Sequence, residues 1–170
     1  LERVHTPQMD SINAVSDSLK AKPKHILKTL MFKLRAGGQE HPGDPGKVDP
    51  NAQRTFLVMA IVRGDHEVNE AKLGRIALAR AEWHGVQPPV SLTLLDKEDL
   101  RRYSIPVGYI GPHFAVTLGG LGETPFVFVD PDAAQPGFWI AGANTVDHHV
   151  KHFNWAREMG DLVSELGQPY

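Results

Sequence analysis

TFLVMAIVRGDHEVNEAKLGR, residues 55–75, joins a long apolar run to a strongly charged segment. The apolar part, residues 55–62, is rich in β-branched and aromatic side chains and lacks polar alternation, which is typical of a strand buried on both faces of a sheet. The charged part has apolar residues at helical spacing and predicts a helix from about Glu67 to the late seventies. Lys72 is expected to project from the first turns of this helix, just beyond the buried strand.

The N-terminal part of the chain contains one further helix pattern and one further strand pattern. Asp10 or Ser11 is placed to cap a helix that Pro23 ends. Residues 25–34 form an apolar run that favours a strand. Residues 35–54 are rich in glycine and proline without periodicity, and they predict a flexible loop or a hairpin excursion.

The rest of the chain is richer in strand patterns. Residues 91–105 predict a short strand and then a helix capped near Asp96. Short β-type runs separated by glycine and proline predict neighbouring antiparallel strands at residues 113–120, 124–130 and 137–144. Residues 148–159 fit either a strand or a helix. The total predicts an α+β domain with a mixed, mostly antiparallel, curved or barrel-like sheet of about six to seven strands, flanked by about three or four helices.

Length and composition exclude several classes of protein. The chain has 170 residues, 41% hydrophobic and 22% charged, which suits a single globular domain. No apolar stretch approaches the roughly 20 residues that a membrane helix needs, and the first residues lack the apolar core of a signal peptide. The absence of cysteine excludes disulfides, thiol catalysis and cysteine-ligated zinc. We expect a cytoplasmic protein without a membrane partner, and a start at Leu1 rather than Met suggests a piece of a longer or processed chain.

One basic stretch stands out against a formal net charge of −2. Six cations lie between residues 20 and 35 with no acid among them: Lys20, Lys22, Lys24, Lys28, Lys33 and Arg35. Most clusters of this kind are solvated surfaces, but this one is also the best candidate in the chain for contact with a nucleic-acid backbone.

Several other places carry residues suited to chemistry. GYIGP, residues 108–112, predicts a tight turn whose backbone N–H groups can face a ligand. Asp130 follows a predicted strand, where it starts a turn or takes part in a site. In residues 142–155, Gly142 and Asn144 permit left-handed backbone geometry.

Histidines are also crowded in residues 142–155. His148 and His152 would lie one turn apart on a helix, where they could share a metal with His66 or Asp147. The spacing matches no standard metalloenzyme motif. The chain also lacks a G-x-S-x-G elbow, a Walker A loop and a dinucleotide-binding G-x-G-x-x-G after a strand.

Taken together and in order, five segments resemble one family. They are ERVHTP (2–7), LKTLMFK (27–33), VRGDHEVNEAKL (62–73), GYIGP (108–112) and GANTVDHHVKHFNW (142–155). They resemble the insertion (editing) domain of bacterial prolyl-tRNA synthetase and its free-standing relatives, the aminoacyl-tRNA deacylases of the YbaK superfamily. The resemblance covers residues 2 to 161, and NWAREMGDLV (154–163) resembles the return to the synthetase catalytic domain, which favours an insertion domain.

This resemblance implies a single editing domain that hydrolyses the ester joining a wrong amino acid to tRNA, typically alanine on tRNA(Pro). It implies no metal and no cofactor, since ATP and magnesium would serve only the ligase activity of the parent synthetase. The implied catalytic residues are Lys72, Gly108, Gly111 and Pro112, and the implied substrate-binding residues are Thr29, Asp130, Gly142, Asn144 and His149. Contact with the 3′ acceptor end of tRNA(Pro) is assigned to Lys22, Lys24 and Lys28.

The chemistry of such a site is simple. An aminoacyl ester is already activated, so its hydrolysis needs a positioned water and stabilisation of the oxyanion, with the neighbouring ribose hydroxyl assisting. Backbone N–H groups of residues 108–111 would serve the carbonyl oxygen, while Lys72, expected to point toward the loop at residues 108–112, would hold the terminal phosphate or the ester oxygens. His149 would shape a pocket that excludes proline or orient the substrate amine. The alternatives are a non-catalytic module that binds the tRNA acceptor end, a free-standing trans-editing deacylase and a histidine-metal hydrolase.

Overall fold

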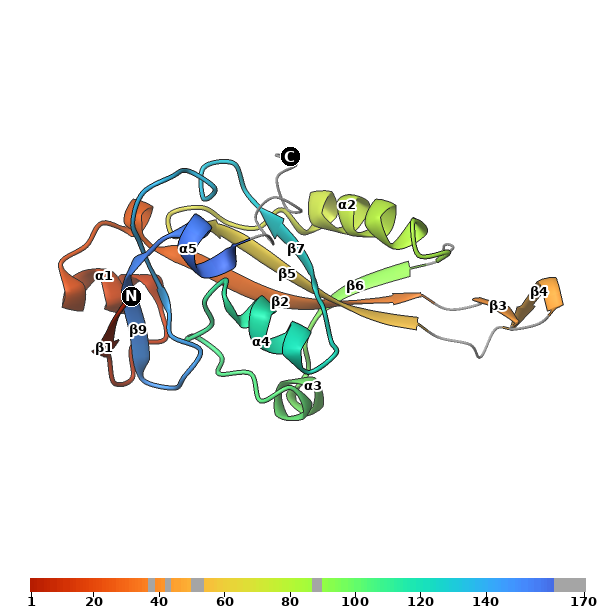
Figure 1. Cartoon of the computed structure of the whole chain (residues 1–170), viewed down its shortest axis with the longest axis horizontal. Coiled ribbons are helices and arrows are strands. Elements are labelled where there is room, and N and C mark those ends of the chain that lie inside the picture. The colour runs from red at the N-terminus through yellow and green to blue at the C-terminus, as the bar shows by residue number, and fades with distance from the viewer. Residues whose placement is uncertain (37–38, 42–43, 50–53, 87–89, 161–170) are drawn as a thin grey trace.

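The computed structural model describes residues 1–36, 39–41, 44–49, 54–86 and 90–160 of the chain (Figure 1). Its largest sheet has four strands in the order β6-β2-β5-β7. The central pair, β2 (Leu27–Ala36) and β5 (Arg54–Arg63), is antiparallel from Leu27 opposite Arg63 to Ala36 opposite Arg54. The edges are β6 (Val90–Leu94), antiparallel to β2, and β7 (Phe126–Val129), parallel to β5.

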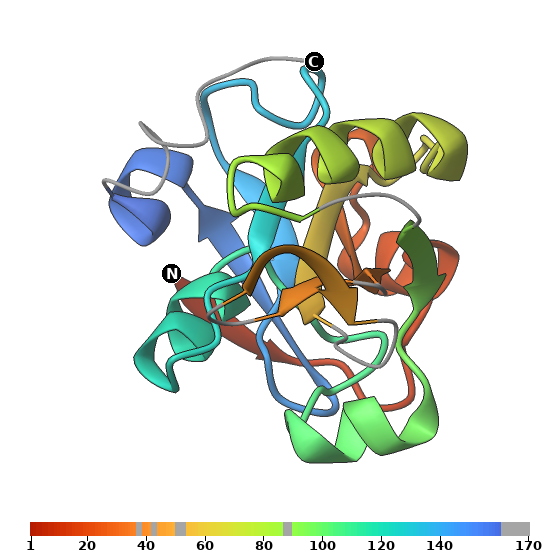
Figure 2. The ribbon, with the colours of Figure 1, turned by 90° about the vertical axis from the view of Figure 1, so that its right-hand side faces the viewer.

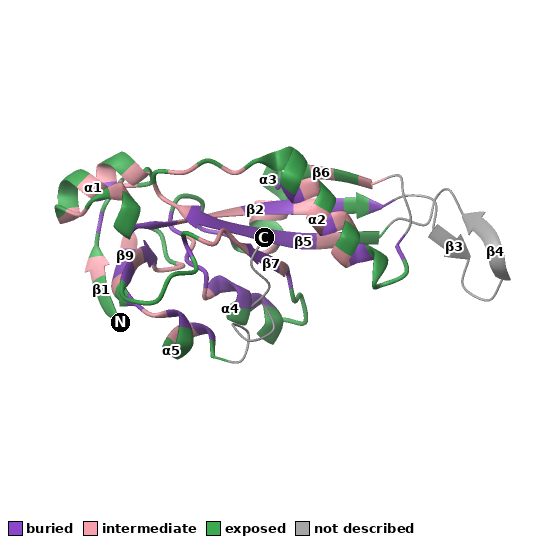
Figure 3. Cartoon of the chain, turned by 90° about the horizontal axis from the view of Figure 1, so that it is seen from above, coloured by how far each residue is buried: buried purple, intermediate pink, exposed green. Residues whose placement is uncertain are grey.

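The burial of β5 explains why its sequence lacks alternation. Val58 and Ala60 pack on one face of the sheet, whereas Met59 and Ile61 pack on the other. Residues 57–62 are all buried, and β5 accordingly is largely purple in Figure 3. The predicted strand with two buried faces is therefore confirmed.

Helix α2 (Glu70–Glu82) covers one face of this sheet (Figure 2). Leu73, Ala77 and Ala81 recur every four residues and are buried against β2 and β5. The helix starts three residues later than predicted because Asn69 caps it: the Asn69 side chain accepts a hydrogen bond of 3.0 Å from the Lys72 N–H.

A three-stranded antiparallel sheet, β1-β9-β8, lies at one end of the molecule (Figure 1). Its strands are β1 (Glu2–His5), β8 (Trp139–Gly142) and β9 (His148–Phe153). An isolated bridge between Ile26 and Ile140 connects this sheet to the start of β2. Because this sheet and the four-stranded sheet are open and separate, the α+β class is confirmed but the described strands do not close into a barrel.

The remaining helices are short. Helix α1 (Ile12–Leu19) begins after the predicted cap Ser11, and the 3-10 helix η1 (Pro23–His25) follows it. Helix α3 (Lys97–Arg102) begins after the predicted cap Asp96. Helices α4 (Phe114–Gly120) and α5 (Trp155–Met159) complete the described set.

Three predictions about the last third of the chain were wrong or incomplete. Residues 113–120 form α4 rather than a strand, because Phe114 and Leu118 lie one helical turn apart and pack together into the core. β7 pairs in parallel with β5 rather than antiparallel with its neighbour in sequence. Residues 148–159 are not one element: a strand ends at Phe153, and Asn154 then caps a helix.

The predicted loop at residues 35–54 is partly outside the described residues. The backbone between the gaps pairs β3 (Gln39–His41) with β4 (Asp44–Asp49) in antiparallel fashion, in keeping with a hairpin excursion.

Candidate functional site

A cavity of about 510 Å³ lies at the start of β2, beyond the end of β6. Its walls come from five parts of the chain: the start of α1, the first half of β2, the end of β6 with the residues after it, the loop at residues 107–110, and the β8–β9 sheet. Four of the predicted site residues line it, namely Thr29, Gly108, Gly142 and His149. We call it the first cavity.

The loop that contains Gly108 is fastened to the turn after β8. The Gly111 N–H donates to Asn144 Oδ1 (2.7 Å), and the Asn144 N–H donates to the Tyr109 carbonyl (2.8 Å). A Cβ atom on Gly142 would lie 2.2 Å from that carbonyl oxygen, so only glycine allows this approach. Gly111 and Asn144 thus fasten this loop to the turn after β8, and neither residue lines the first cavity.

The same contacts limit which backbone groups can serve a ligand. The Tyr109 N–H donates to the Pro106 carbonyl (2.9 Å), and the Gly111 N–H already donates to Asn144 Oδ1. The N–H groups of Gly108 and Ile110 donate to no acceptor within the part of the chain that the structure describes, and both residues line the first cavity. Two of the four predicted backbone donors therefore remain available.

His149 is buried in the wall of this cavity with 4% of its surface exposed. Its Nδ1 atom lies 2.6 Å from Thr6 Oγ1, and its ring lies 5.4 Å from that of Tyr109. Burial lowers the pKa of His149 to about 4, so the imidazole is neutral at pH 7.

Thr29 carries an unusual hydroxyl group. Its Oγ1 atom is buried, has no hydrogen-bond partner among the residues that the structure describes, and belongs to a residue that lines the first cavity. An unpaired buried hydroxyl is destabilising by about 1–3 kcal/mol, so such groups are uncommon unless they serve a ligand.

The structure separates Lys28 from the other cations assigned to tRNA. Lys28 lines the first cavity, its side chain is only 18% exposed, and its Nζ lies 3.0 Å from Glu67 Oε1. Lys22, the N-cap of η1, and Lys24, within η1, are both exposed and lie shortly before the cavity-lining start of β2.

A second cavity of about 250 Å³ lies under α2, where the parallel strands β5 and β7 end. Lys72 and Asp130 both line it, among apolar walls that include Val62 and Phe128. None of residues 108–112 lines this cavity, so Lys72 and the loop toward which it was expected to point line different cavities. The Lys28–Glu67 ion pair joins the walls of the two cavities, since Glu67 lines the second one.

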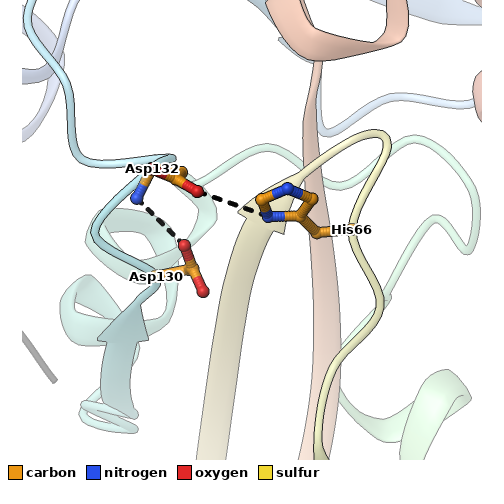
Figure 4. Close-up of side chains that lie close together, drawn as sticks. All are labelled: His66, Asp130 and Asp132. Atoms are coloured by element: carbon orange, nitrogen blue, oxygen red, sulfur yellow. Dashed lines mark hydrogen bonds and ion pairs between the residues drawn. The ribbon is translucent and has the colours of Figure 1, made fainter.

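His66, Asp130 and Asp132 form the one group of possible metal ligands found within the described residues (Figure 4). His66 Nδ1 lies 3.8 Å from Asp132 Oδ2, and His66 Nε2 lies 3.1 Å from Arg63 Nη2. Arg63 also forms two hydrogen bonds with Asp65, which raise the pKa of the guanidinium. A guanidinium so close to the imidazole repels a metal ion and already compensates the carboxylates.

The metal site considered around His148 and His152 does not form as predicted, because both residues lie on strand β9 rather than on a helix. His148 Nδ1 lies 2.9 Å from the Val146 carbonyl, and His152 lies 3.7 Å from Glu2. Asp147 instead accepts hydrogen bonds from the Gln8 N–H and the Tyr109 hydroxyl, which hold the pKa of that carboxyl below its ordinary value.

Comparison with known proteins identifies the family. Residues 6–159 match the family model of the aminoacyl-tRNA editing domain. The chain belongs to this family. The predicted resemblance is therefore confirmed over nearly the whole length of this editing domain.

The editing domain is also similar to part of several synthetases. It is 32% identical over 161 residues to the proline--tRNA ligase of Synechococcus elongatus, covering 91% of this chain and 24% of the ligase. The proline--tRNA ligase of Thermoanaerobacter pseudethanolicus is 29% identical over 167 residues, covering 97% of this chain and 24% of that protein. The chain thus spans about a quarter of the length of these relatives.

Among solved structures, the editing domain resembles one described as a candidate trans-editing enzyme for prolyl tRNA synthetase. The TM-score is 0.57 at 16% identity, and the match covers 99% of this chain and 83% of the other. At this identity the likeness establishes the fold alone.

The sequence did not single out Ile110, which lines the first cavity, and it missed Thr6, which contacts the histidine of that cavity. Ile110 was only one of several loop positions, and Thr6 lies 143 residues from the histidine that it contacts. The only signal for Thr6 was its place in ERVHTP, which carries part of the family resemblance.

Proposed function

We propose that this editing domain hydrolyses the ester bond of mischarged tRNA, with alanine on tRNA(Pro) as its main substrate, without a metal ion. The observation that best supports this is the first cavity, whose lining includes Thr29 with a hydroxyl unpaired among the described residues, His149 with a neutral imidazole, and the backbone N–H groups of Gly108 and Ile110. Such a set of neutral donors suits a carbonyl that becomes an oxyanion.

A ligase needs an editing site apart from its synthetic site because selection of amino acids by size is limited. A synthetic site cannot reject a smaller amino acid well, because a missing methylene is worth only about 1–3 kcal/mol. A separate site that admits the small product and excludes the large one solves this problem. In the first cavity, apolar residues such as Leu27, Met31 and Leu95 supply walls for such exclusion.

No protein nucleophile is needed for an activated ester. Ser11 lines the first cavity, but its Oγ accepts the Ala14 N–H and caps α1. In the proposal, the N–H groups of Gly108 and Ile110 stabilise the oxyanion, and the ribose hydroxyl next to the ester helps to activate water. Thr29 provides a further polar contact, while Asp130 and Lys72 in the second cavity hold the adjoining part of the tRNA end.

The proposed partner is the 3′ acceptor end of tRNA(Pro) in the cytoplasm, with Lys22 and Lys24 near its phosphates and Lys28 inside the first cavity. The similarity to ligases favours an insertion domain that works beside a synthetase catalytic domain. The structural likeness to a candidate trans-editing enzyme favours a free-standing deacylase as the second possibility.

The test is a deacylation assay with tRNA(Pro) charged with alanine, proline, serine or cysteine. We expect hydrolysis of Ala-tRNA(Pro), little hydrolysis of Pro-tRNA(Pro), and a loss of activity in Lys72→Ala. Arg75→Ala is the matched control, since Arg75 is an exposed cation on the same helix that lines neither cavity.

Three results would contradict parts of the proposal. Wild-type activity in Lys72→Ala would remove Lys72 from the site. Binding of tRNA without hydrolysis of any charged form would indicate a binding module. Activity that disappears with a chelator and returns with zinc would overturn the metal-free mechanism.

A further inference from the structure

Thr6 places a fully buried hydroxyl against the histidine of the first cavity. The residue is 0% exposed, and its Oγ1 lies 2.6 Å from His149 Nδ1. Its backbone is held on both sides, because the Thr6 N–H donates to the Asp147 carbonyl (2.8 Å) and the Thr6 carbonyl accepts from the Met9 N–H (3.3 Å). Within the described residues the imidazole is the only partner of this hydroxyl.

The single hydrogen of this hydroxyl decides between the two neutral forms of the imidazole. If the Thr6 O–H donates to Nδ1, the ring proton lies on Nε2 and both groups are satisfied. If Nδ1 carries the proton and donates to Thr6, the hydroxyl hydrogen is left buried without an acceptor. The penalty for a buried unsatisfied donor corresponds to roughly a 5- to 150-fold preference for the first form.

We infer that Thr6 fixes His149 as the Nε2–H tautomer, so that His149 presents a hydrogen-bond donor to the first cavity and binds an oxygen atom of the ligand. The α-amino group of an aminoacyl ester, when protonated, is itself only a donor and cannot accept this bond. The Nε2–H tautomer therefore favours an oxygen atom over a protonated substrate amine, the partner in one of the two expected roles of His149.

In the context of the proposed function, on which this role rests, the oxygen is the ester carbonyl. His149 then acts with the N–H groups of Gly108 and Ile110 as a third donor to the developing oxyanion. Thr6 does not touch the substrate and is a positioning residue. The low pKa of His149 keeps the ring neutral over the pH range of an assay, so that the tautomer remains defined.

The direct test is nitrogen NMR of the wild-type protein labelled with ¹⁵N-histidine at pH 7. The His149 signals are assigned among the nine histidines by their absence in His149→Phe. We expect Nε2 to carry the proton and Nδ1 to show the shift of an unprotonated nitrogen that accepts a hydrogen bond. A proton on Nδ1 would overturn the inference.

Two variants test the positioning role. Thr6→Val keeps the shape of the side chain but removes the hydroxyl, whereas Thr6→Ser keeps the hydroxyl. We expect the Nδ1 signal to shift in Thr6→Val, and kcat for Ala-tRNA(Pro) to fall at least about 10-fold with KM changed less than about 2-fold, because loss of the group that orients a functional imidazole has effects of this order. Thr6→Ser should restore both.

Other outcomes separate this inference from the proposed function. Unchanged kcat in Thr6→Val, or a Thr6→Ser protein no better than Thr6→Val, would show that Thr6 only packs. The NMR measurement needs no substrate, so an Nε2–H tautomer in a protein that hydrolyses no charged tRNA would support the inference and overturn the proposed function.

Discussion

Replacing Thr29 by valine should make the protein more stable and less active. Valine keeps the β-branched shape that suits strand β2, and it removes a buried hydroxyl that has no partner in the described part of the chain. Relief of that desolvation penalty should raise the free energy of unfolding by about 1–3 kcal/mol. In a domain of this size, each kcal/mol raises the melting temperature by roughly 2–4 °C. If the hydroxyl serves the substrate, deacylation of Ala-tRNA(Pro) should fall by about 10-fold, the worth of one hydrogen bond near 1.4 kcal/mol.

The measurements are urea unfolding and a deacylation assay on the same preparation. Thr93→Val is the matched control, because Thr93 is an exposed threonine on the neighbouring strand β6 and its change should stay within about 0.5 kcal/mol. A Thr29→Val protein that is less stable than the wild type would refute the reasoning, since it would show that the hydroxyl is satisfied in the folded state. Increased stability with full activity would leave the structural reasoning intact and remove Thr29 from the site.

Two further predictions concern His149 and the glycines. The folded-state pKa of His149 lies below its ordinary value, so the stability that it contributes is fully present above pH 6.5 and is lost as pH falls toward about 4. Urea unfolding should show a loss of roughly 2 kcal/mol between pH 6.5 and pH 5. His149→Phe should flatten this dependence, and an equal slope in both proteins would contradict the assignment. Gly142→Ala should lower stability by about 1–3 kcal/mol, because its Cβ would meet the Tyr109 carbonyl, whereas Gly74→Ala, inside α2 with open space around it, should raise the melting temperature slightly. A thermal melt in which both glycine variants behave alike would disprove this account of the loop.

The sequence predicted best those elements in which local pattern and packing agree. Strand β5 has enough β-branched and aromatic residues to be recognised alone, and α1 and α3 begin directly after their predicted caps, Ser11 and Asp96. Helix α4 was missed because phenylalanine, valine and threonine favour strands, while the contacts that make it helical come from residues distant in sequence. The parallel pairing of β7 with β5 likewise depends on the whole chain and leaves no local signal.

The site residues likewise divide into those that the sequence predicted correctly and those whose position depends on the whole fold. Thr29, Gly108, Gly142 and His149 were predicted from the family resemblance, and the structure places all four around one cavity. The same resemblance gave no reason to expect Lys72 to lie in a different cavity, because a motif records residue types and order but not which face of a sheet they occupy. Lys28 was grouped with exposed cations for a similar reason, since charge alone does not reveal burial.

The pairing of β1 with β9 also affects the order in which the molecule assembles. Residues 2–5 lie beside residues 148–151, so this ladder has a very large sequence separation and must form late in folding. During synthesis, the four-stranded sheet and α2 can be complete in sequence before β9 has been made. The histidine of the first cavity, and the threonine that orients it, therefore meet only when almost the entire domain has left the ribosome. A nascent chain that ends before β9 would lack His149, and a chain truncated beyond residue 6 would lack Thr6, so neither would have a complete first cavity with its histidine oriented.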